Sequence, residues 1–176
     1  MKLTPISERF ILHWGEMGSR WGVNRTVAQI HALLFLIGKP MAADEIVEVL
    51  SVARSNVSNS LKELLDWRLV RVVHTIGERR ERFEASMDIW ERFRLIVEGR
   101  RKREIDPTLT TLRDCLMSPE LDQEPEEHVQ RIQETLEFLE TLTTWTDEML
   151  RLKPETLKRV LSIMNRISRM VRRTKA

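Results

Sequence analysis

Apolar residues recur every three or four positions along most of the chain, which predicts a mainly helical protein. The pattern predicts an amphipathic helix over residues 7–17 and a second helix over residues 24–37. The apolar face of the second helix is broad, as in a helix buried at the centre of a domain. Asn24 can cap its start, and Gly38 can end it. A short helix is predicted next, over residues 44–50.

The following helix combines a regular apolar face with an unusual polar one. Its apolar residues are Val52, Val57, Leu61, Leu64 and Leu65. Its polar residues are Ser51, Ser55, Asn56, Ser58, Asn59 and Ser60. Serine and asparagine are poor helix formers because their short side chains compete for backbone hydrogen bonds. The polar face therefore needs an explanation other than helix stability.

A β-hairpin is predicted directly after this helix. Residues 69–74 are apolar and β-branched, and a second strand over residues 80–84 follows a turn that contains Gly77. The order of elements is then helix, short helix, turn, helix and hairpin, which is the order of a winged helix-turn-helix. We therefore expect a mainly α fold with a small β-hairpin wing and additional N- and C-terminal helices for dimerisation.

Helical spacing returns from Met87 and continues to the C-terminus. Asp106-Pro107 has the form of a capped helix start. In the helix predicted over residues 126–152, apolar residues step by three and four, as in a helix that packs against another helix. A last helix is predicted over residues 155–173. The expected segments are an N-terminal helical segment (1–23), the winged helix-turn-helix (24–86), linking and dimerisation helices (87–117), an acidic linker (118–125) and a C-terminal helical hairpin (126–176).

The winged helix-turn-helix gives the polar helix a function. With its apolar face on the core, its other face can enter the major groove of DNA, where small hydrogen-bonding side chains allow close approach to base edges. Asparagine pairs well with adenine and arginine with guanine, while Lys62 is placed for phosphate. The predicted contacts are Arg54, Ser55, Asn56, Ser58, Asn59 and Lys62 on the helix, and Arg79, Arg80 and Arg82 on the wing.

Other interpretations of these elements stay open. An isolated wing of this sequence would be a solvated turn whose Glu78 and Glu81 neutralise its arginines, although its place directly after the polar helix favours a DNA contact. We expect a sequence-specific, DNA-binding transcriptional regulator that acts as a homodimer on double-stranded DNA. The alternatives are a winged-helix protein-protein interaction module and a non-specific architectural DNA-binding protein.

Charge changes this picture only near the C-terminus. The formal net charge is +2, so bulk charge gives no argument for binding to a polyanion such as DNA. Residues 120–140 hold eight acidic residues against one arginine, a local charge of −7, and residues 151–175 hold nine basic residues against one glutamate, or +8. Such oppositely charged helices can pair within a chain or between chains. We favour self-pairing over a basic arm for nucleic acid.

The sequence gives little support for catalysis. His13, His31, His74 and His128 are scattered without metal-ligand spacing, and no nucleophile elbow or phosphate-binding glycine loop is present. We predict no enzyme activity, no cofactor and no metal site. His31 lies beside the apolar face of its helix and is expected to be a core histidine with its hydrogen bonds made. The lone cysteine, Cys115, is expected to be buried and inert.

No segment has the pattern of a membrane span or a secretion signal. The longest apolar run, residues 32–37, has six residues, whereas a bilayer needs about 20. The first residues, MKLTPISER, lack the apolar core of a signal peptide. The expected location is the cytoplasm, with no membrane partner.

Four stretches together resemble the GbsR-type branch of the MarR-like winged-helix transcriptional regulators. They are GEMGSRWGVNRTVAQIHALLFLIGKPMAADEIVEVL, ARSNVSNSLKELLDWRLVR, GERRERFEA and KREIDPTLTTLRDCL, and the resemblance covers about residues 1–117. It implies a homodimeric DNA-binding repressor or activator, in a branch whose members are linked to choline or glycine-betaine metabolism. By position, it implies a recognition helix over Arg54–Asp66 and a wing over His74–Arg82, with Arg79 and Arg80 at the basic tip.

The chain departs from the family pattern at two positions. Ala53 stands where the family usually has a serine that caps the recognition helix, and such a cap contributes about 0.5 to 2 kcal/mol. Ser51 is a candidate to compensate. Arg68 stands where many members have glycine, which is expected to strain a left-handed C-terminal cap.

Tryptophan usage raises the question of an effector. The chain has five tryptophans and no tyrosine, and aromatic side chains can enclose a quaternary ammonium ligand. Trp14, Trp21 and Trp90 lie on predicted helices that flank the DNA-reading core. We hypothesise an effector pocket between the N-terminal region and the helix after the wing. The alternative is that these side chains fill the core and the dimer interface.

Overall fold

The computed structural model describes the backbone of residues 1–74, 77 and 80–174, with side chains as far as residue 166. Its contacts divide the chain into two compact units, Met1–Gly99 and Arg100–Ala176, which are described separately below. Among the described helices, none is long and apolar enough to cross a membrane.

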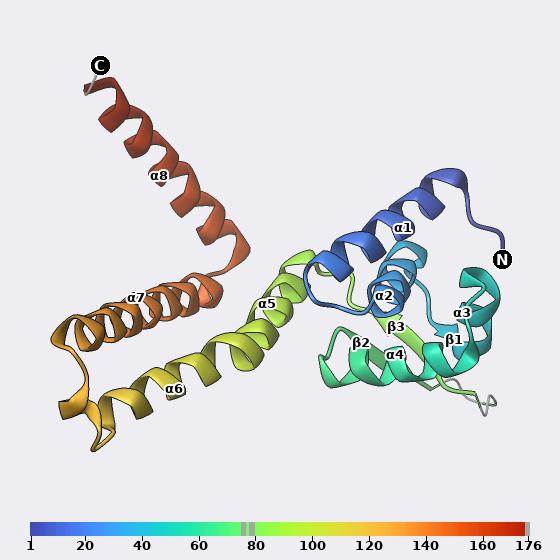
Figure 1. Cartoon of the computed structure of the whole chain (residues 1–176). Helices are drawn as coiled ribbons and strands as arrows, with labels where there is room; N and C mark the ends of the chain where they lie inside the picture. Colours follow the sequence, from blue (N-terminus) through green and yellow to red (C-terminus); the bar gives the residue numbers. More distant parts are fainter. Residues whose placement is uncertain (75–76, 78–79, 175–176) are drawn as a thin grey trace. The chain divides into compact units, whose positions relative to one another are not determined.

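The first unit has the element order of a winged helix-turn-helix (Figure 1). Its helices are α1 (Pro5–Arg20), α2 (Arg25–Ile37), α3 (Ala43–Leu50), α4 (Arg54–Asp66) and α5 (Ile89–Arg100). Its strands are β1 (Met41–Ala42), β2 (Val70–Val73) and β3 (Arg82–Ala85), which form an antiparallel sheet in the order β1-β3-β2. The predicted hairpin is confirmed. The short strand β1 was not predicted, because two residues are too few to show a period.

Helix α2 lies at the centre of this unit, as its broad apolar face predicted. Ile30, Leu33 and Leu34 are fully buried and belong to the main hydrophobic core. Helix α1 packs closely on α2 at Gly18, where an added Cβ would lie 2.5 Å from the Cβ of Ala28. A larger side chain at this position would therefore force the two helices apart.

Both predicted ends of α2 are confirmed. The Asn24 side chain accepts a hydrogen bond from the Thr26 N–H at 2.8 Å, which satisfies a backbone donor at the start of the helix. Gly38 ends the helix in the left-handed conformation, at φ 61°. Glycine is favoured there because it has no Cβ to oppose positive φ.

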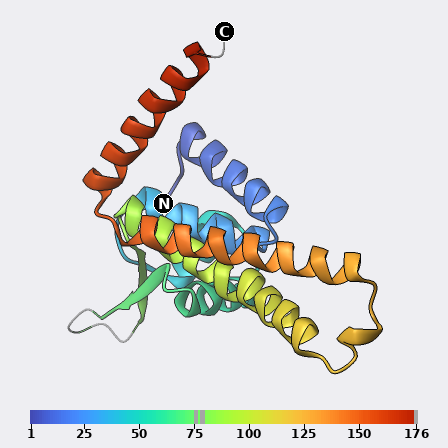
Figure 2. The same ribbon diagram turned by 90° about the vertical axis from the view of Figure 1, so that its left-hand side faces the viewer.

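The second unit begins with a π-helix, Arg101–Ile105, that runs directly into α6 (Asp106–Met117). A 3-10 turn (Leu121–Gln123) then leads to α7 (Glu126–Arg151) and α8 (Pro154–Thr174). Helices α6 and α7 lie side by side in Figures 1 and 2.

Ion pairs join α6 and the π-helix to α7. Arg113 binds Glu140 at 2.6 Å, and Arg101 binds both Asp106 and Asp147. Two expectations are wrong in this unit. Asp106 is no cap, because the preceding π-helix already places it in helical backbone. Cys115 is exposed rather than buried.

Two polar residues, His31 on α2 and Arg92 on α5, are buried in the first unit. His31 is 5% exposed, as predicted for a core histidine, but its Nε2 has no hydrogen-bond partner among the described residues, so the expectation of a fully bonded side chain is wrong. Burial, and then the positive charge of Arg92, lowers the pKa of His31 to about 4. The Arg92 guanidinium lies 3.6 Å from the centre of the Phe35 ring, a cation–π contact. His31 is therefore neutral near pH 7.

We predict that His31→Leu will reduce the loss of stability in acid. With a pKa of about 4 when folded and 6.5 when unfolded, His31 binds more protons in the unfolded state as the pH falls below 6.5. The folded state should therefore lose about 2 kcal/mol between pH 7.5 and pH 5 through this group alone. Urea unfolding at both pH values measures the difference. The exposed His13→Gln serves as the control and should keep the full wild-type loss.

The end of α4 contains the strained residue that the sequence predicted. Arg68 has φ 58°, and the Leu69 N–H donates to the Leu64 carbonyl at 3.0 Å, as in a Schellman motif. Left-handed backbone costs a residue with a Cβ roughly 1 to 2 kcal/mol. The strain is therefore at the junction of α4 and the wing.

We predict that Arg68→Gly will raise the free energy of unfolding by roughly 0.5 to 1 kcal/mol, because relief of strain outweighs the extra freedom of glycine in the unfolded chain. Chemical denaturation of both proteins measures this. The control is Arg68→Ala, which removes the charge and keeps the Cβ. If Arg68→Ala stabilises the fold equally, the charge and not the backbone is responsible.

Candidate nucleic-acid interface

The inward face of α4 fixes which of its side chains reach solvent. Val57, Leu61 and Leu64 are buried in the core, where α4 packs against α2. The predicted ridge is exposed on the other side, at Arg54, Ser55, Asn56, Ser58, Asn59 and Lys62. Ser60 is buried and does not belong to this ridge. The predicted orientation of α4 is therefore confirmed.

A tight turn delivers the chain from α3 into α4. Ser51 ends α3 in the left-handed conformation at φ 51°, and Ala53 precedes α4 in extended backbone. No side chain of Ala53 caps α4, as the sequence predicted. Ser51 makes no compensating bond among the described residues, since its conformation serves the turn instead. The first N–H groups of α4 thus have no side-chain cap.

Arg54, at the start of the ridge, has an ion-pair partner on α3. Its guanidinium lies 3.0 Å from the carboxylate of Asp44, and both side chains are largely exposed. Surface pairs of this kind contribute about 0 to 1 kcal/mol. Because the pair is exposed and weak, a guanine edge or a phosphate can replace Asp44 as the partner of Arg54.

The wing arginines differ in their surroundings. Arg80 is exposed, and Arg79 lies outside the described residues. Arg82 lies at the base of the wing, where it binds the Glu45 carboxylate at 3.2 Å and the Pro40 carbonyl at 3.4 Å. It is a structural brace between β3 and α3 rather than an exposed wing side chain.

Glu45 is shared between this brace and the start of α3. The same carboxylate oxygen that binds Arg82 accepts a hydrogen bond from the Ala42 N–H at 2.7 Å. One side chain thus ties the wing, β1 and the first turn of α3 together. Sequence reasoning missed this role because the two charged residues are far apart in the chain.

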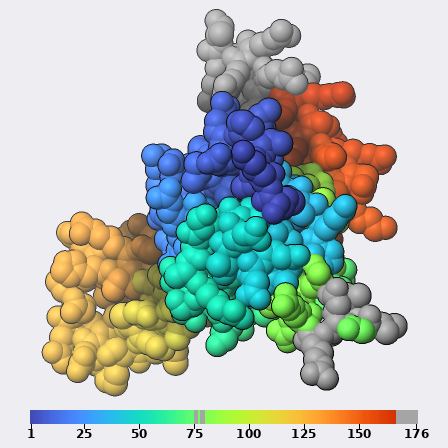
Figure 3. Space-filling model, turned by 90° about the vertical axis from the view of Figure 1, so that its right-hand side faces the viewer, coloured from blue at the N-terminus to red at the C-terminus, as the bar shows by residue number. Residues whose placement is uncertain are grey.

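An open hollow of about 350 Å³ lies between α3, the exposed side of α4 and the wing. Its lining includes Asp44, Arg54, Ser58, Lys62 and Arg80. Figure 3 shows part of this surface from outside, with the blue-green atoms of the helix-turn-helix open to solvent and the described part of the wing in green. The hollow brings residues of the predicted helix and the predicted wing to one surface.

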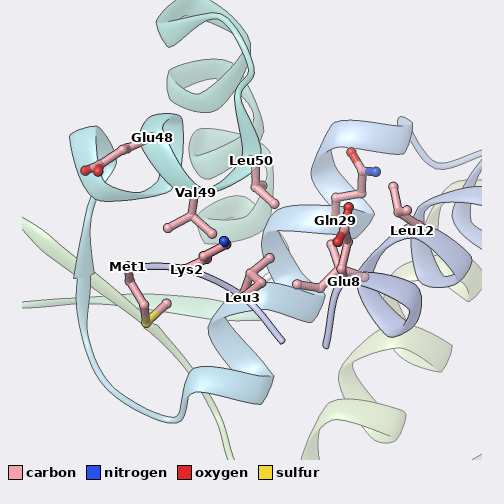
Figure 4. A pocket seen from close by; sticks show the side chains of 10 residues that line it. Met1, Lys2, Leu3, Glu8, Leu12, Gln29, Glu48, Val49 and Leu50 are labelled. Atoms are coloured by element: carbon pink, nitrogen blue, oxygen red, sulfur yellow. The ribbon is translucent and has the colours of Figure 1, made fainter. Parts of the chain in front are cut away.

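A second hollow, of about 540 Å³, lies between the N-terminal segment, α1, α2 and the end of α3. Figure 4 shows Leu3, Val49 and Leu50 directed toward this space, with Lys2 between them, while Glu48 points away. Apolar groups thus form much of its lining. The hollow touches α3, the first helix of the helix-turn-helix.

The structure does not bring Trp14, Trp21 and Trp90 to either hollow. Trp14 is 41% exposed and stacks on Phe10, with ring centres 5.3 Å apart, and Trp21 is 58% exposed. Trp90 is half-buried on α5. Core filling therefore does not account for Trp14 and Trp21.

Comparison with known proteins agrees with this geometry. Residues 21–81, which span α2 to the wing, match the model of the MarR family. This stretch is therefore similar to the MarR family. A relative from Bacillus subtilis strain 168, with the provisional name HTH-type transcriptional regulator YvaV, is 21% identical over 151 residues, which cover 80% of this chain and 85% of the relative.

A solved structure supports the fold. The crystal structure of a transcriptional regulator, 16% identical in sequence, overlaps 83% of this chain and 96% of its own with a TM-score of 0.64. The mainly helical fold with a small antiparallel sheet is thus shared with a regulator of known structure.

Proposed function

We propose that this chain is a sequence-specific transcriptional regulator that binds DNA as a homodimer. The MarR-type domain and the named relative support a DNA-binding transcriptional regulator. The observation that carries the finer proposal is the exposed ridge of serine and asparagine on α4, held outward by buried Val57, Leu61 and Leu64.

In the proposed complex, α4 enters the major groove. Small side chains at Ser55 and Ser58 let the helix backbone approach the bases, while Asn56 and Arg54 supply two-pronged hydrogen bonds to base edges. A good pair of this kind gives about 1 to 3 kcal/mol of discrimination between bases. Lys62, further along the ridge, is placed to reach phosphate.

The wing would contact the backbone or the minor groove beside this site. Arg80 supports that role by its exposure, and Arg79 by its position in the sequence. A hairpin held by the sheet loses less conformational entropy on binding than a flexible basic loop. We do not include Arg82 among the contacts, because Glu45 and Pro40 already bind it.

The homodimer is supported by an exposed apolar stripe on α5. Ile89, Phe93 and Ile96 are all exposed and are spaced by four and three residues, so they lie along one side of the helix. A second copy that covers this stripe would present two recognition helices. Such a dimer would bind an inverted repeat with half-sites about 34 Å apart.

The last part of the proposal is that a small effector controls DNA binding. The sequence motifs resemble the GbsR-type branch, and Trp14 and Trp21 are 41% and 58% exposed, as aromatic side chains that meet an organic cation must be. We therefore propose a quaternary ammonium compound as the ligand, held by these residues and Trp90.

We predict that Arg54→Ala and Asn56→Ala will relax base preference in selections from random duplex DNA, by about 1 to 3 kcal/mol at one position of each half-site. Arg80→Ala should instead weaken all sequences alike and make the dependence of affinity on salt less steep. Arg131→Ala on α7 is the control for loss of one exposed arginine, and should leave binding unchanged.

The same measurements separate the alternatives. Absent binding, or binding that is flat between low and moderate salt, favours a module that recognises protein. Binding without any preferred sequence favours an architectural DNA-binding protein. If Asn56→Ala weakens every sequence equally and Arg80→Ala alters base preference, the roles of helix and wing are reversed.

We predict that choline will raise the melting temperature and change the affinity for DNA, because a ligand that binds only the folded state stabilises it. The double variant Trp14→Leu, Trp90→Leu should lose both effects. The double variant Trp14→Phe, Trp90→Phe, which keeps an aromatic ring at both positions, is the matched control and should keep most of each effect. If choline and glycine betaine leave both quantities of the wild-type protein unchanged, the proposed ligand class is wrong.

A further inference from the structure

Helix α8 carries an exposed apolar face within the part whose side chains are described. Leu161 and Met164 are 44% and 48% exposed, and with Leu157 they follow helical spacing along one side. In Figures 1 and 2, α8 leaves the end of α7 and extends away from the α6–α7 pair. Within the described residues, no other element packs on α8 as α7 packs on α6.

Helix α7 carries a second apolar ridge, separate from its contact with α6. Phe138, Leu142 and Trp145 are 64%, 42% and 52% exposed and are spaced by four and three residues. Glu140 and Asp147, which bind arginines of α6 and the π-helix, mark the other side of α7. The ridge is therefore free while the α6–α7 contact is made.

The two apolar surfaces are equal in length and lie in segments of opposite charge. Each extends over eight residues, a rise of about 10 Å along the helix axis. The ridge on α7 adjoins Glu134 and Glu137 in a strongly acidic segment, whereas α8 lies in the segment of local charge +8. Glu137 and Arg166 each make no ion pair with any described residue. Apolar contact and opposite charge thus favour the same pairing.

The connection between the helices disfavours pairing within one chain. Only Leu152 and Lys153 separate α7 from α8, and Pro154 begins α8. In Figures 1 and 2 this short connection directs α8 away from α7. A second copy of the chain supplies both missing surfaces at once, since each α8 can cover the other copy's ridge about a two-fold axis.

We propose that two copies of this chain exchange their α8 helices, each α8 packing its apolar face on the Phe138–Leu142–Trp145 ridge of the other copy. This proposal rests on the homodimer of the proposed function and names a second surface that holds it. A negatively charged membrane is another partner for a helix with one apolar and one basic side. The sequence of α8 has no tryptophan or phenylalanine, which such helices commonly insert.

Cross-linking between differently tagged chains tests the exchange directly. In a Cys115→Ser background, one full-length chain carries Leu142→Cys and the other Leu161→Cys, the centres of the two surfaces. A short bis-maleimide should join the two chains into a mixed dimer. When Ser162→Cys, on the polar side of α8, is used in place of Leu161→Cys, the yield of mixed dimer should be low. The proposal is wrong if the cross-link forms within a single chain that carries both cysteines and no mixed dimer appears.

A second measurement uses the double variant Leu161→Glu, Met164→Glu in the full-length chain. Sedimentation equilibrium should show a dimer dissociation constant raised at least about tenfold, because two charges enter the apolar contact. Ser162→Glu adds a charge to the polar side of α8 and should leave the dimer unchanged. An unchanged dimer in the double variant, with binding to phosphatidylserine vesicles in the wild type only, would assign α8 to membranes instead.

Failure of this proposal differs from failure of the proposed function. Loss of α8 exchange should weaken the dimer while binding to a single half-site remains, because α4 and the wing are unaltered. Arg54→Ala with Asn56→Ala should have the reverse effect, with the dimer intact and base preference lost. An intact dimer without mixed cross-links contradicts only the exchange.

Discussion

The burial of three side chains, Val57, Leu61 and Leu64, governs what this protein can do. Their contact with the core around α2 fixes the rotation of α4 about its axis, so that the serines and asparagines must face solvent. A rotation of half a turn would bury these polar groups without partners, at a cost of roughly 1 to 3 kcal/mol for each unpaired group. The ridge is therefore a consequence of the core.

The core alone does not set the place of the wing relative to α4. That relation depends on the polar contacts of Glu45, which holds both the Ala42 N–H and the guanidinium of Arg82. An arginine at the base of a basic hairpin thus serves the fold, and only the arginines toward its tip are assigned to DNA in the proposed complex. Equal charge at three wing positions does not mean equal function.

Sequence reasoning succeeded where one local pattern has one physical outcome. The capping of α2 by Asn24, the inward face of α4 and the left-handed backbone of Arg68 all depend on near neighbours in the chain. It failed where the outcome depends on distant segments. Cys115 is exposed on α6, whose main described contacts are with α7 and the two short helices beside it, and the partner of Arg82 lies 37 residues away.

Although the net charge is near zero, acidic and basic residues are concentrated in different segments near the C-terminus. A dimer held only beside the DNA-binding surfaces would have to combine tight association with the exact spacing that two major-groove contacts require. Oppositely charged helices at the far end of the sequence allow the two demands to be met by different residues. In the proposed dimer, charges on α7 and α8 can then strengthen association without altering the polar ridge of α4, on which the proposed base recognition depends.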